Sequence, residues 1–161
     1  MRIIGIDPCL IATGYGVVDI HSGAVRVIEA GTIEPQKSAP LEEKLAKIHH
    51  HLTGILQTHK PDAAVLEKLY SHSKYPATAP VLGHVRGVIC LSVAQQGIKL
   101  IEQSPKLIRK ALTGNGNATK IQCQEFVKRL LNIKSPGFKL DASDALSLAL
   151  GQAHILRYDL L

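Results

Sequence analysis

The sequence predicts an α/β fold in which a mixed five-stranded sheet, three antiparallel strands followed by α-linked strands, carries helices on both faces. Two observations support this fold class. Residues 2–34 contain short runs of β-branched residues separated by turn residues, whereas apolar residues from Leu41 onward recur every three or four positions. The expected order of elements is β-β-β-α-β-α-β-α-α-α. We expect one domain over residues 1–161.

Five segments are predicted as strands. RIIGID at residues 2–7 is a short apolar run that ends at an acid, which is typical of a central strand. TGYGVVDI at 13–20 and AVRVIEAGTIE at 24–34 follow it, and the HSG between them indicates a hairpin turn. AAVLE at 63–67 is predicted as a buried strand, and IKLIEQ at 98–103 as the fifth strand.

Five further segments are predicted as helices. Between Leu41 and Ile55, apolar residues recur at spacings of four, three, four and three, and Pro40 stands where helices commonly begin. Ser104 occupies a capping position directly before a proline, which starts another helix. The predicted helices cover residues 41 to about 59, about 81–96, 104–112, about 120–131 and about 140–158.

The composition favours a soluble, basic, cytoplasmic protein. Lys and Arg total 19 against 13 Asp and Glu, for a net charge of +6, which favours a polyanionic partner. The sequence has three cysteines, an odd number, and no two of them form a C-x-x-C motif. A disulfide framework or a zinc site is therefore not expected. No segment has the length and character of a signal peptide or a membrane span, and we expect no membrane association.

Four acids stand at the ends of predicted elements. Asp7 closes the first strand, Glu67 closes the fourth, and Asp141 and Asp144 open the last helix on one face. If the first and fourth strands are neighbours, Asp7 and Glu67 lie side by side at a sheet edge where sites are usually built. Carboxylates crowded in one cleft hold each other protonated unless cations neutralise them. Two Mg²⁺ ions, with Mn²⁺ as a substitute, suit these ligands and the chemistry of phosphoryl displacement.

Each acid also has an ordinary explanation. An Asp at a helix start often caps free amides and complements the helix dipole, and Asp7 before Pro8 can form a turn. Glu67 has no evident capping role, so the hypothesis of a metal site depends on all four acids together. Without these four, nine of the 13 acids remain against 19 basic residues, a balance that suits an enzyme acting on a phosphate polymer.

A family resemblance runs through five segments in order and spacing: GIDPCLIATGYGVV, AVLEKLY, LGHVRGV, TGNGNATKIQ and LDASDALSLAL. They resemble the signature segments of the RuvC family of bacterial Holliday junction resolvases, over nearly the whole chain. The resemblance implies a ribonuclease H-like fold and a homodimer. It also implies Mg²⁺-dependent paired nicking of four-way DNA junctions that leaves 5′-phosphate and 3′-hydroxyl ends, with the branch-migration proteins RuvA and RuvB as partners.

The resemblance also assigns roles to individual residues. The four acids match the family's catalytic and metal-binding acids. Tyr70 matches an aromatic residue that stacks on bases near the junction centre, and Arg109 and Lys120 match basic positions near the scissile phosphate. Arg109 and Lys120, together with Lys106 and Lys110, flank a Gly-rich loop. These four basic residues and Tyr70 are the DNA-binding candidates. The alternative is an ordinary solvated helix followed by a flexible loop.

Gly83 and Gly87 stand four residues apart in the second predicted helix. Small residues at that spacing let another helix approach closely, and the RuvC family dimerises through this helix. We therefore expect a dimer interface there. The alternative is an accommodation of local packing within the same chain.

Three positions depart from the family pattern. Cys9 replaces the glycine that usually follows GIDP, Asn117 replaces a frequent basic residue, and Arg109 stands where Lys is common. His154, three turns beyond the acids, is expected to be structural. Two other functions compete: a non-catalytic nucleic-acid-binding module, or a different ribonuclease H-like nuclease. GID and TGYG also resemble the phosphate loop of actin-like ATPases and sugar kinases, but those proteins need a second nucleotide lobe that 161 residues cannot supply.

Overall fold

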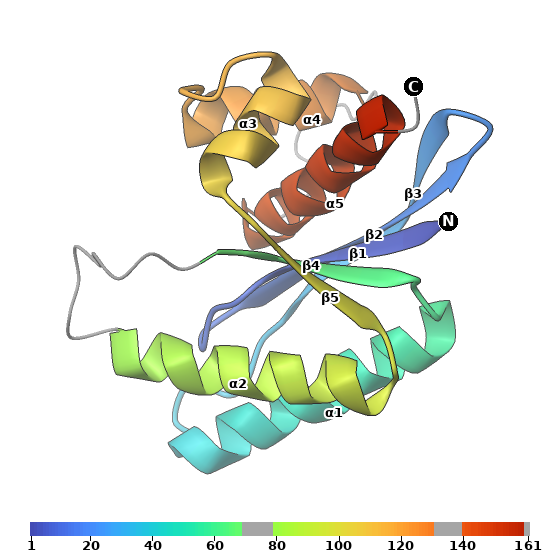
Figure 1. The fold of residues 1–161 in the computed structure, drawn as a ribbon. Helices are drawn as coiled ribbons and strands as arrows, with labels where there is room; N and C mark the ends of the chain where they lie inside the picture. Colours follow the sequence, from blue (N-terminus) through green and yellow to red (C-terminus); the bar gives the residue numbers. More distant parts are fainter. Residues whose placement is uncertain (69–78, 131–139, 160–161) are drawn as a thin grey trace.

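The structure is a computed structural model that describes residues 1–68, 79–130 and 140–159. The elements follow the predicted order, and their bounds differ from the predicted ones by at most two residues (Figure 1). They are β1 (Arg2–Asp7), β2 (Thr13–His21), β3 (Ala24–Ile33), α1 (Leu41–His59), β4 (Ala63–Glu67), α2 (Ala79–Gln95), β5 (Lys99–Gln103), α3 (Pro105–Thr113), α4 (Lys120–Leu130) and α5 (Leu140–Asp159).

The strands form one mixed sheet in the order β3-β2-β1-β4-β5. The central strand β1 pairs antiparallel with β2 and parallel with β4, and β4 pairs parallel with β5. The first and fourth strands are therefore neighbours, as the predicted closeness of Asp7 and Glu67 requires. In the β1–β2 register, Asp7 lies opposite Gly14. These findings confirm the predicted mixed five-stranded sheet.

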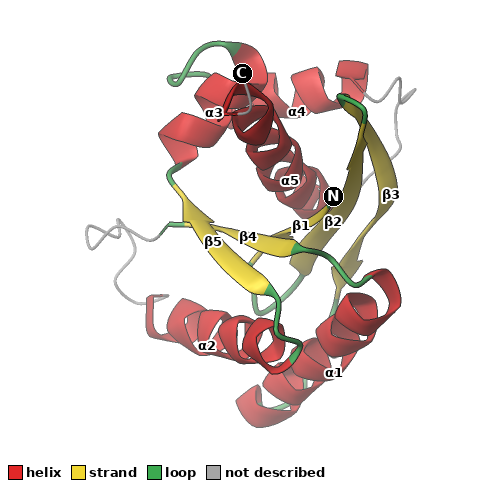
Figure 2. Ribbon diagram, turned by 45° about the vertical axis from the view of Figure 1, so that its right-hand side comes forward, coloured by secondary structure: helices red, strands yellow, loops and turns green. Residues whose placement is uncertain are grey.

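Helices cover both faces of the sheet: α1 and α2 lie on one face, and α3, α4 and α5 on the other (Figure 2). Side chains alternate along a strand, so each strand feeds two cores. Ile4 packs in the core with α1 and α2, whereas Ile3 and Val65 pack in the core with α5. The same alternation carries Asp7 and Glu67 to the face that α5 covers. No described helix has both the length and the apolar character needed to cross a bilayer.

Glycines in β1 and β2 let α5 lie directly on the sheet. A Cβ atom on Gly5 would stand 2.0 Å from the backbone oxygen of Ala145, and one on Gly14 would stand 2.1 Å from that of Asp141. Both neighbours are backbone atoms, which cannot yield as a flexible side chain does. The absence of side chains at these glycines therefore sets how closely the first turns of α5 approach the strands.

Candidate active site

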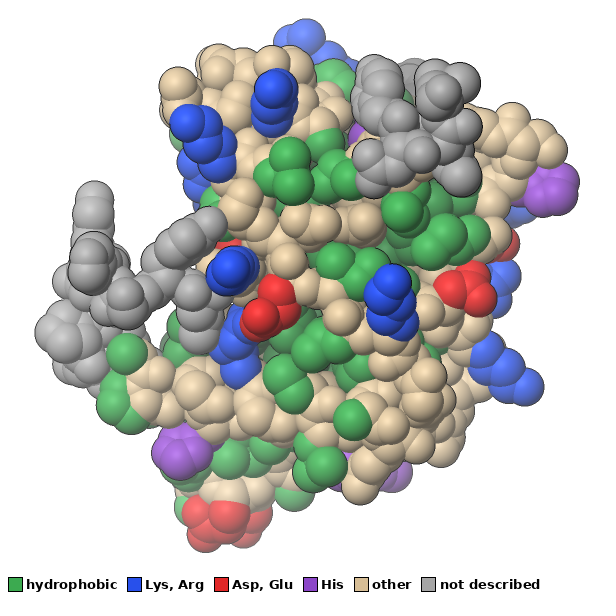
Figure 3. All heavy atoms as spheres, viewed as in Figure 1, with side chains coloured by type: hydrophobic (Ala, Val, Ile, Leu, Met, Phe, Trp, Pro, Cys, Tyr) green, Lys and Arg blue, Asp and Glu red, His purple; other side chains and the backbone are tan. Residues whose placement is uncertain are grey.

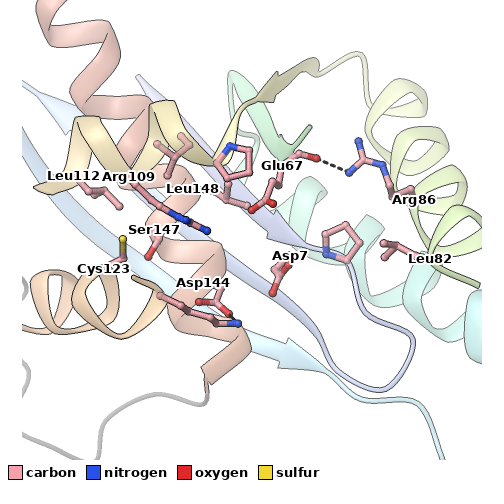
Figure 4. Close-up of a pocket in the computed structure, with 14 residues that line it drawn as sticks. Asp7, Glu67, Leu82, Arg86, Arg109, Leu112, Cys123, Asp144, Ser147 and Leu148 are labelled. Atoms are coloured by element: carbon pink, nitrogen blue, oxygen red, sulfur yellow. Dashed lines mark hydrogen bonds and ion pairs between the residues drawn. The ribbon is translucent and has the colours of Figure 1, made fainter. Parts of the chain in front are cut away.

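A cavity of about 350 Å³ opens where the ends of β1 and β4 meet α2, α3, α4 and α5 (Figure 4). We call it the acidic cleft. Acids and cations of different elements point into it, and apolar side chains from α2, α3 and α5 form much of its remaining wall. The charged residues that line the acidic cleft are Asp7, Glu67, Arg86, Arg109, Lys120 and Asp144.

Three carboxylates converge beside this cleft, and two of them, Asp7 and Asp144, line it. Asp7, Asp141 and Asp144 each offer an oxygen atom, and these atoms all lie within 4.8 Å of one another. β1 supplies the first acid, and one turn of α5 supplies the other two. Glu67 lines the same cleft from the end of β4 but lies outside this group of three. The structure thus brings three of the four predicted acids close enough together to share a metal ion, and it places Glu67 in the cleft that Asp7 and Asp144 also line.

The crowding of acids is visible in the protonation of Asp7. Burial, the largest cause, and repulsion from Asp144, Asp141 and Glu67 together raise its pKa from 3.8 to about 7, against the opposing effect of Lys120. A carboxyl group with that pKa is half protonated at neutral pH. Carboxylate oxygens in this arrangement are the ligands that Mg²⁺ and Mn²⁺ take, and a divalent cation would relieve the repulsion. The donor set therefore fits such an ion.

Glu67 is anchored through its backbone by an arginine that the sequence interpretation had given no role. Arg86 of α2 is buried, donates a hydrogen bond to the carbonyl oxygen of Glu67 at 2.7 Å, and forms an ion pair with Glu102 of β5. Desolvation raises the pKa of Glu67, and repulsion from Asp144 adds to it, while Arg109 is the strongest of the cations that oppose the rise. A single arginine within an otherwise apolar helix was the available signal.

The position of Lys120 follows from the way α4 begins. Thr119 accepts a hydrogen bond from the backbone N–H of Gln122 at 3.2 Å, and the Gln122 side chain accepts one from the backbone N–H of Thr119 at 2.8 Å. This reciprocal pair is a capping box, whose T-x-x-Q pattern was readable in the sequence but was not used. It makes Lys120 the first helical residue, and its ammonium group forms an ion pair with Asp144.

The other predicted DNA-binding residues fall on one basic surface. Arg109 lines the acidic cleft from α3, and Lys106 and Lys110 are exposed on the same helix, where Lys and Arg side chains gather in Figure 3. The Gly-rich loop packs on this helix, since a Cβ atom on Gly116 would stand 2.9 Å from Lys106 Cγ. Tyr70 lies outside the described residues.

Gly83 and Gly87 are exposed on α2, and an added Cβ atom at either would meet nothing within 4 Å. Packing against the described part of this chain therefore does not require glycine at these positions. Within the described residues, local packing in the same chain therefore does not explain why Gly83 and Gly87 are glycines. Their role at a dimer interface stays a prediction.

The remaining noted residues, Cys9, Asn117 and His154, do not line the acidic cleft. Cys9 is half-buried and does not line the acidic cleft, and its carbonyl oxygen accepts a hydrogen bond from Thr13 Oγ1 at 2.6 Å. Asn117 is exposed and donates its backbone N–H to the side chain of Asn115 at 2.9 Å. His154 is half-buried and is also absent from the cleft lining.

Comparisons with known proteins agree over almost the whole chain. The family model described as Crossover junction endodeoxyribonuclease RuvC matches residues 3–152. The crossover junction endodeoxyribonuclease RuvC of Rhodopirellula baltica is 40% identical over 148 residues, which cover 92% of this chain and 83% of that protein. The protein of the same name from Azorhizobium caulinodans is 38% identical over 154 residues, which cover 96% and 90%.

Solved structures share the fold. Thermus thermophilus RuvC superposes with a TM-score of 0.88 at 24% identity, covering 99% of this chain and 97% of that one. T. thermophilus RuvC in complex with a Holliday junction substrate superposes with a TM-score of 0.86 at 22% identity, covering 98% and 96%. This likeness, with the sheet order, confirms the predicted ribonuclease H-like fold. From the extent of the family match and the identity to its relatives, the chain belongs to the RuvC family of crossover junction endodeoxyribonucleases.

Proposed function

We propose that this chain is a metal-dependent endonuclease that makes paired, symmetric nicks in four-way DNA junctions and leaves 5′-phosphate and 3′-hydroxyl ends. The observation that carries the proposal is the group of three carboxylates, two of which line a cleft that Glu67, Arg109 and Lys120 also line, on a chain of this family. Oxygen ligands for cations and cationic groups for a phosphate stand together there. A non-catalytic binding module has no need of acids that repel both each other and DNA.

The residues divide the work by position. Asp7, Asp141 and Asp144 hold the cations between β1 and α5, and Glu67 completes their ligands from β4. When bound, two Mg²⁺ ions, or Mn²⁺ in their place, supply polarisation of the attacking water and neutralisation of the leaving 3′-oxygen. Arg109 attracts the phosphate into the cleft and stabilises the negative charge that develops on it.

The substrate follows from symmetry and from the basic surface. A homodimer with twofold symmetry presents two acidic clefts, which suits a four-way junction that has the same symmetry. Lys106 and Lys110 extend the cationic surface beyond the cleft and contact flanking phosphates. Tyr70 stacks on an unpaired base near the junction centre. A relative of this fold has been solved with a Holliday junction substrate, which supports this choice of DNA.

Removal of the metal is the direct test of this function. The protein is incubated with a synthetic mobile four-way junction and, separately, with a linear duplex of the same sequence, in Mg²⁺ or in EDTA. We expect symmetric paired nicks in the junction with Mg²⁺, no cleavage in EDTA, and no comparable cleavage of the duplex. Ligation of the nicked product without further treatment reports 5′-phosphate and 3′-hydroxyl ends. Cleavage in EDTA, or equal cleavage of the duplex, contradicts the proposal.

The dimer can be tested by charge at the exposed glycines of α2. A Gly87→Glu substitution places two carboxylates near each other across a twofold interface, so we expect the dimer to dissociate at least about tenfold more readily, which corresponds to about 1.4 kcal/mol. Analytical ultracentrifugation measures this, and junction nicks should lose their pairing. Gly54→Glu is the matched control, because Gly54 is also exposed on a helix with open space around it. Equal dissociation of both variants would place the interface elsewhere.

A further inference from the structure

Lys120 is paired with Asp144, one of the three acids that would hold a metal ion. Its ammonium group pairs with Asp144 Oδ2, although the lysine side chain is 63% exposed and the Asp144 side chain only 17%. The lysine therefore reaches inward from the surface to a carboxylate that is mostly covered. A lysine ammonium is a cation at neutral pH, so the pair joins a positive charge to one of the three acids.

Asp144 has a second partner besides Lys120. Its other oxygen, Oδ1, accepts a hydrogen bond from the side-chain amide of Gln124 at 3.3 Å, and Gln124 is buried, with 8% of its surface exposed. Gln124 lies one helical turn beyond Lys120 on α4, so one helix holds both oxygens of the carboxylate. Lys120 can leave while Gln124 keeps Asp144 in place. The buried amide of Gln124 is suited to holding the carboxylate in place, and the exposed ammonium group of Lys120 is suited to leaving it.

We infer that Lys120 is a resident counter-cation that occupies the carboxylates of the free protein, competes there with a divalent metal, and transfers to a DNA phosphate when substrate binds. The inference rests on the proposed function, because it needs both a metal at the acids and a phosphate at the cleft. A cation paired with Asp144 repels a divalent ion at the same group. Drawing Lys120 onto a phosphate removes that repulsion, so metal and DNA strengthen each other's binding, and by linkage the factor is the same in both directions.

The test measures metal binding by the free protein, where cleavage has no part. Mn²⁺ is titrated into wild-type protein and the Lys120→Gln, Lys120→Arg and Lys128→Gln variants, and the unbound ion is counted by electron paramagnetic resonance. Lys128→Gln is the matched control, because Lys128 lies on the same helix and pairs at 3.1 Å with Glu125, outside the acid group. We expect Lys120→Gln to bind Mn²⁺ at least about fivefold more tightly than wild type, and the other two variants to bind as wild type does.

A second titration includes a four-way junction, kept cold and checked on a gel to be uncut. The junction should tighten Mn²⁺ binding by wild type, and by a clearly smaller factor for Lys120→Gln. Weaker or unchanged Mn²⁺ binding by free Lys120→Gln overturns the inference, as does an equal effect of Lys128→Gln. If wild type fails to cut junctions while free Lys120→Gln still binds Mn²⁺ more tightly, the proposed function fails and competition at the acids stands. If wild type cuts junctions while free Lys120→Gln binds Mn²⁺ no more tightly than wild type, the proposed function stands and only the competition between Lys120 and the metal is rejected.

Discussion

An Asp7→Asn variant is expected to lose at least about 10³-fold in junction cleavage and yet to be more stable than the wild-type protein at pH 8 without metal. The loss follows because Asp7 is the one ligand of the group of three that β1 supplies. Metal ions contribute several kcal/mol of transition-state stabilisation in such reactions, and each 1.4 kcal/mol corresponds to a factor of ten in rate. Single-turnover cleavage of a saturating junction measures this loss.

The gain in stability follows from the raised pKa of Asp7. The folded protein keeps its proton up to about pH 7, whereas the unfolded chain loses it near 3.8. Stability from the protonated carboxyl is therefore complete below pH 3.8 and is lost as pH rises through 7. At pH 8 the wild-type protein carries an ionised Asp7 among other acids, and asparagine removes that charge. We expect a gain of roughly 2 to 4 kcal/mol at pH 8 and a smaller gain at pH 5.

Urea unfolding in EDTA at both pH values measures the gain. Asp19→Asn serves as the control of opposite sign, because a hydrogen bond from Arg2 lowers the pKa of Asp19, so its stabilisation is present above its unfolded pKa and is lost as pH falls. That variant should be less stable than wild type at pH 8. Mg²⁺ should raise the melting temperature of wild type and hardly that of Asp7→Asn. Destabilisation of Asp7→Asn at pH 8 would contradict a raised pKa of Asp7 in the folded protein.

Much of the fold and part of the site were within reach of the sequence, because both depend on periodicity. The alternation along RIIGID and AAVLE fixes which face receives Asp7 and Glu67, and the three-residue spacing fixes that Asp141 and Asp144 share a face of α5. Strand order was needed to bring these pairs together. From the sequence, the proximity of Asp7 and Glu67 could only be made conditional on the first and fourth strands being neighbours. The parallel pairing of β1 with β4 meets that condition.

Other parts of the site are set by tertiary packing that no local pattern reveals. The reach of Glu67 depends on how β4 ends and on its anchor, Arg86, so its place outside the group of three carboxylates was not predictable from spacing. The hydrogen bond from Gln124 to Asp144 joins α4 to α5 between residues 20 positions apart in the sequence. The glycines of β2 signal close approach of another segment, but only the structure shows that the first two turns of α5 are the segment concerned.

A Gly14→Ala variant is expected to lose about 10²-fold or more in cleavage while keeping every charged residue of the site. Gly14 lies opposite Asp7 in the sheet, and an added methyl group would stand 2.1 Å from the carbonyl oxygen of Asp141 and 2.5 Å from its carbonyl carbon. Since neither strand nor helix backbone can yield locally, α5 must lift, which carries its two acids away from Asp7. A displacement of about 1 Å in a catalytic group costs about 10²-fold in rate, and overpacking costs roughly 1 to 3 kcal/mol of stability.

To separate displacement of α5 from general destabilisation by a glycine-to-alanine change, the control must be a strand glycine whose neighbouring atoms can move. Gly31 of β3 is that control, because an added methyl group would stand 2.8 Å from the hydroxyl group at the end of the Tyr15 side chain, which can shift. Gly31→Ala should keep cleavage within a few-fold of wild type. Gly14→Ala should retain the circular dichroism of the folded protein but bind Mn²⁺ more weakly, because its carboxylates no longer converge. If Gly14→Ala binds Mn²⁺ and cuts junctions like wild type, the separation of β2 and α5 does not control the geometry of the acids.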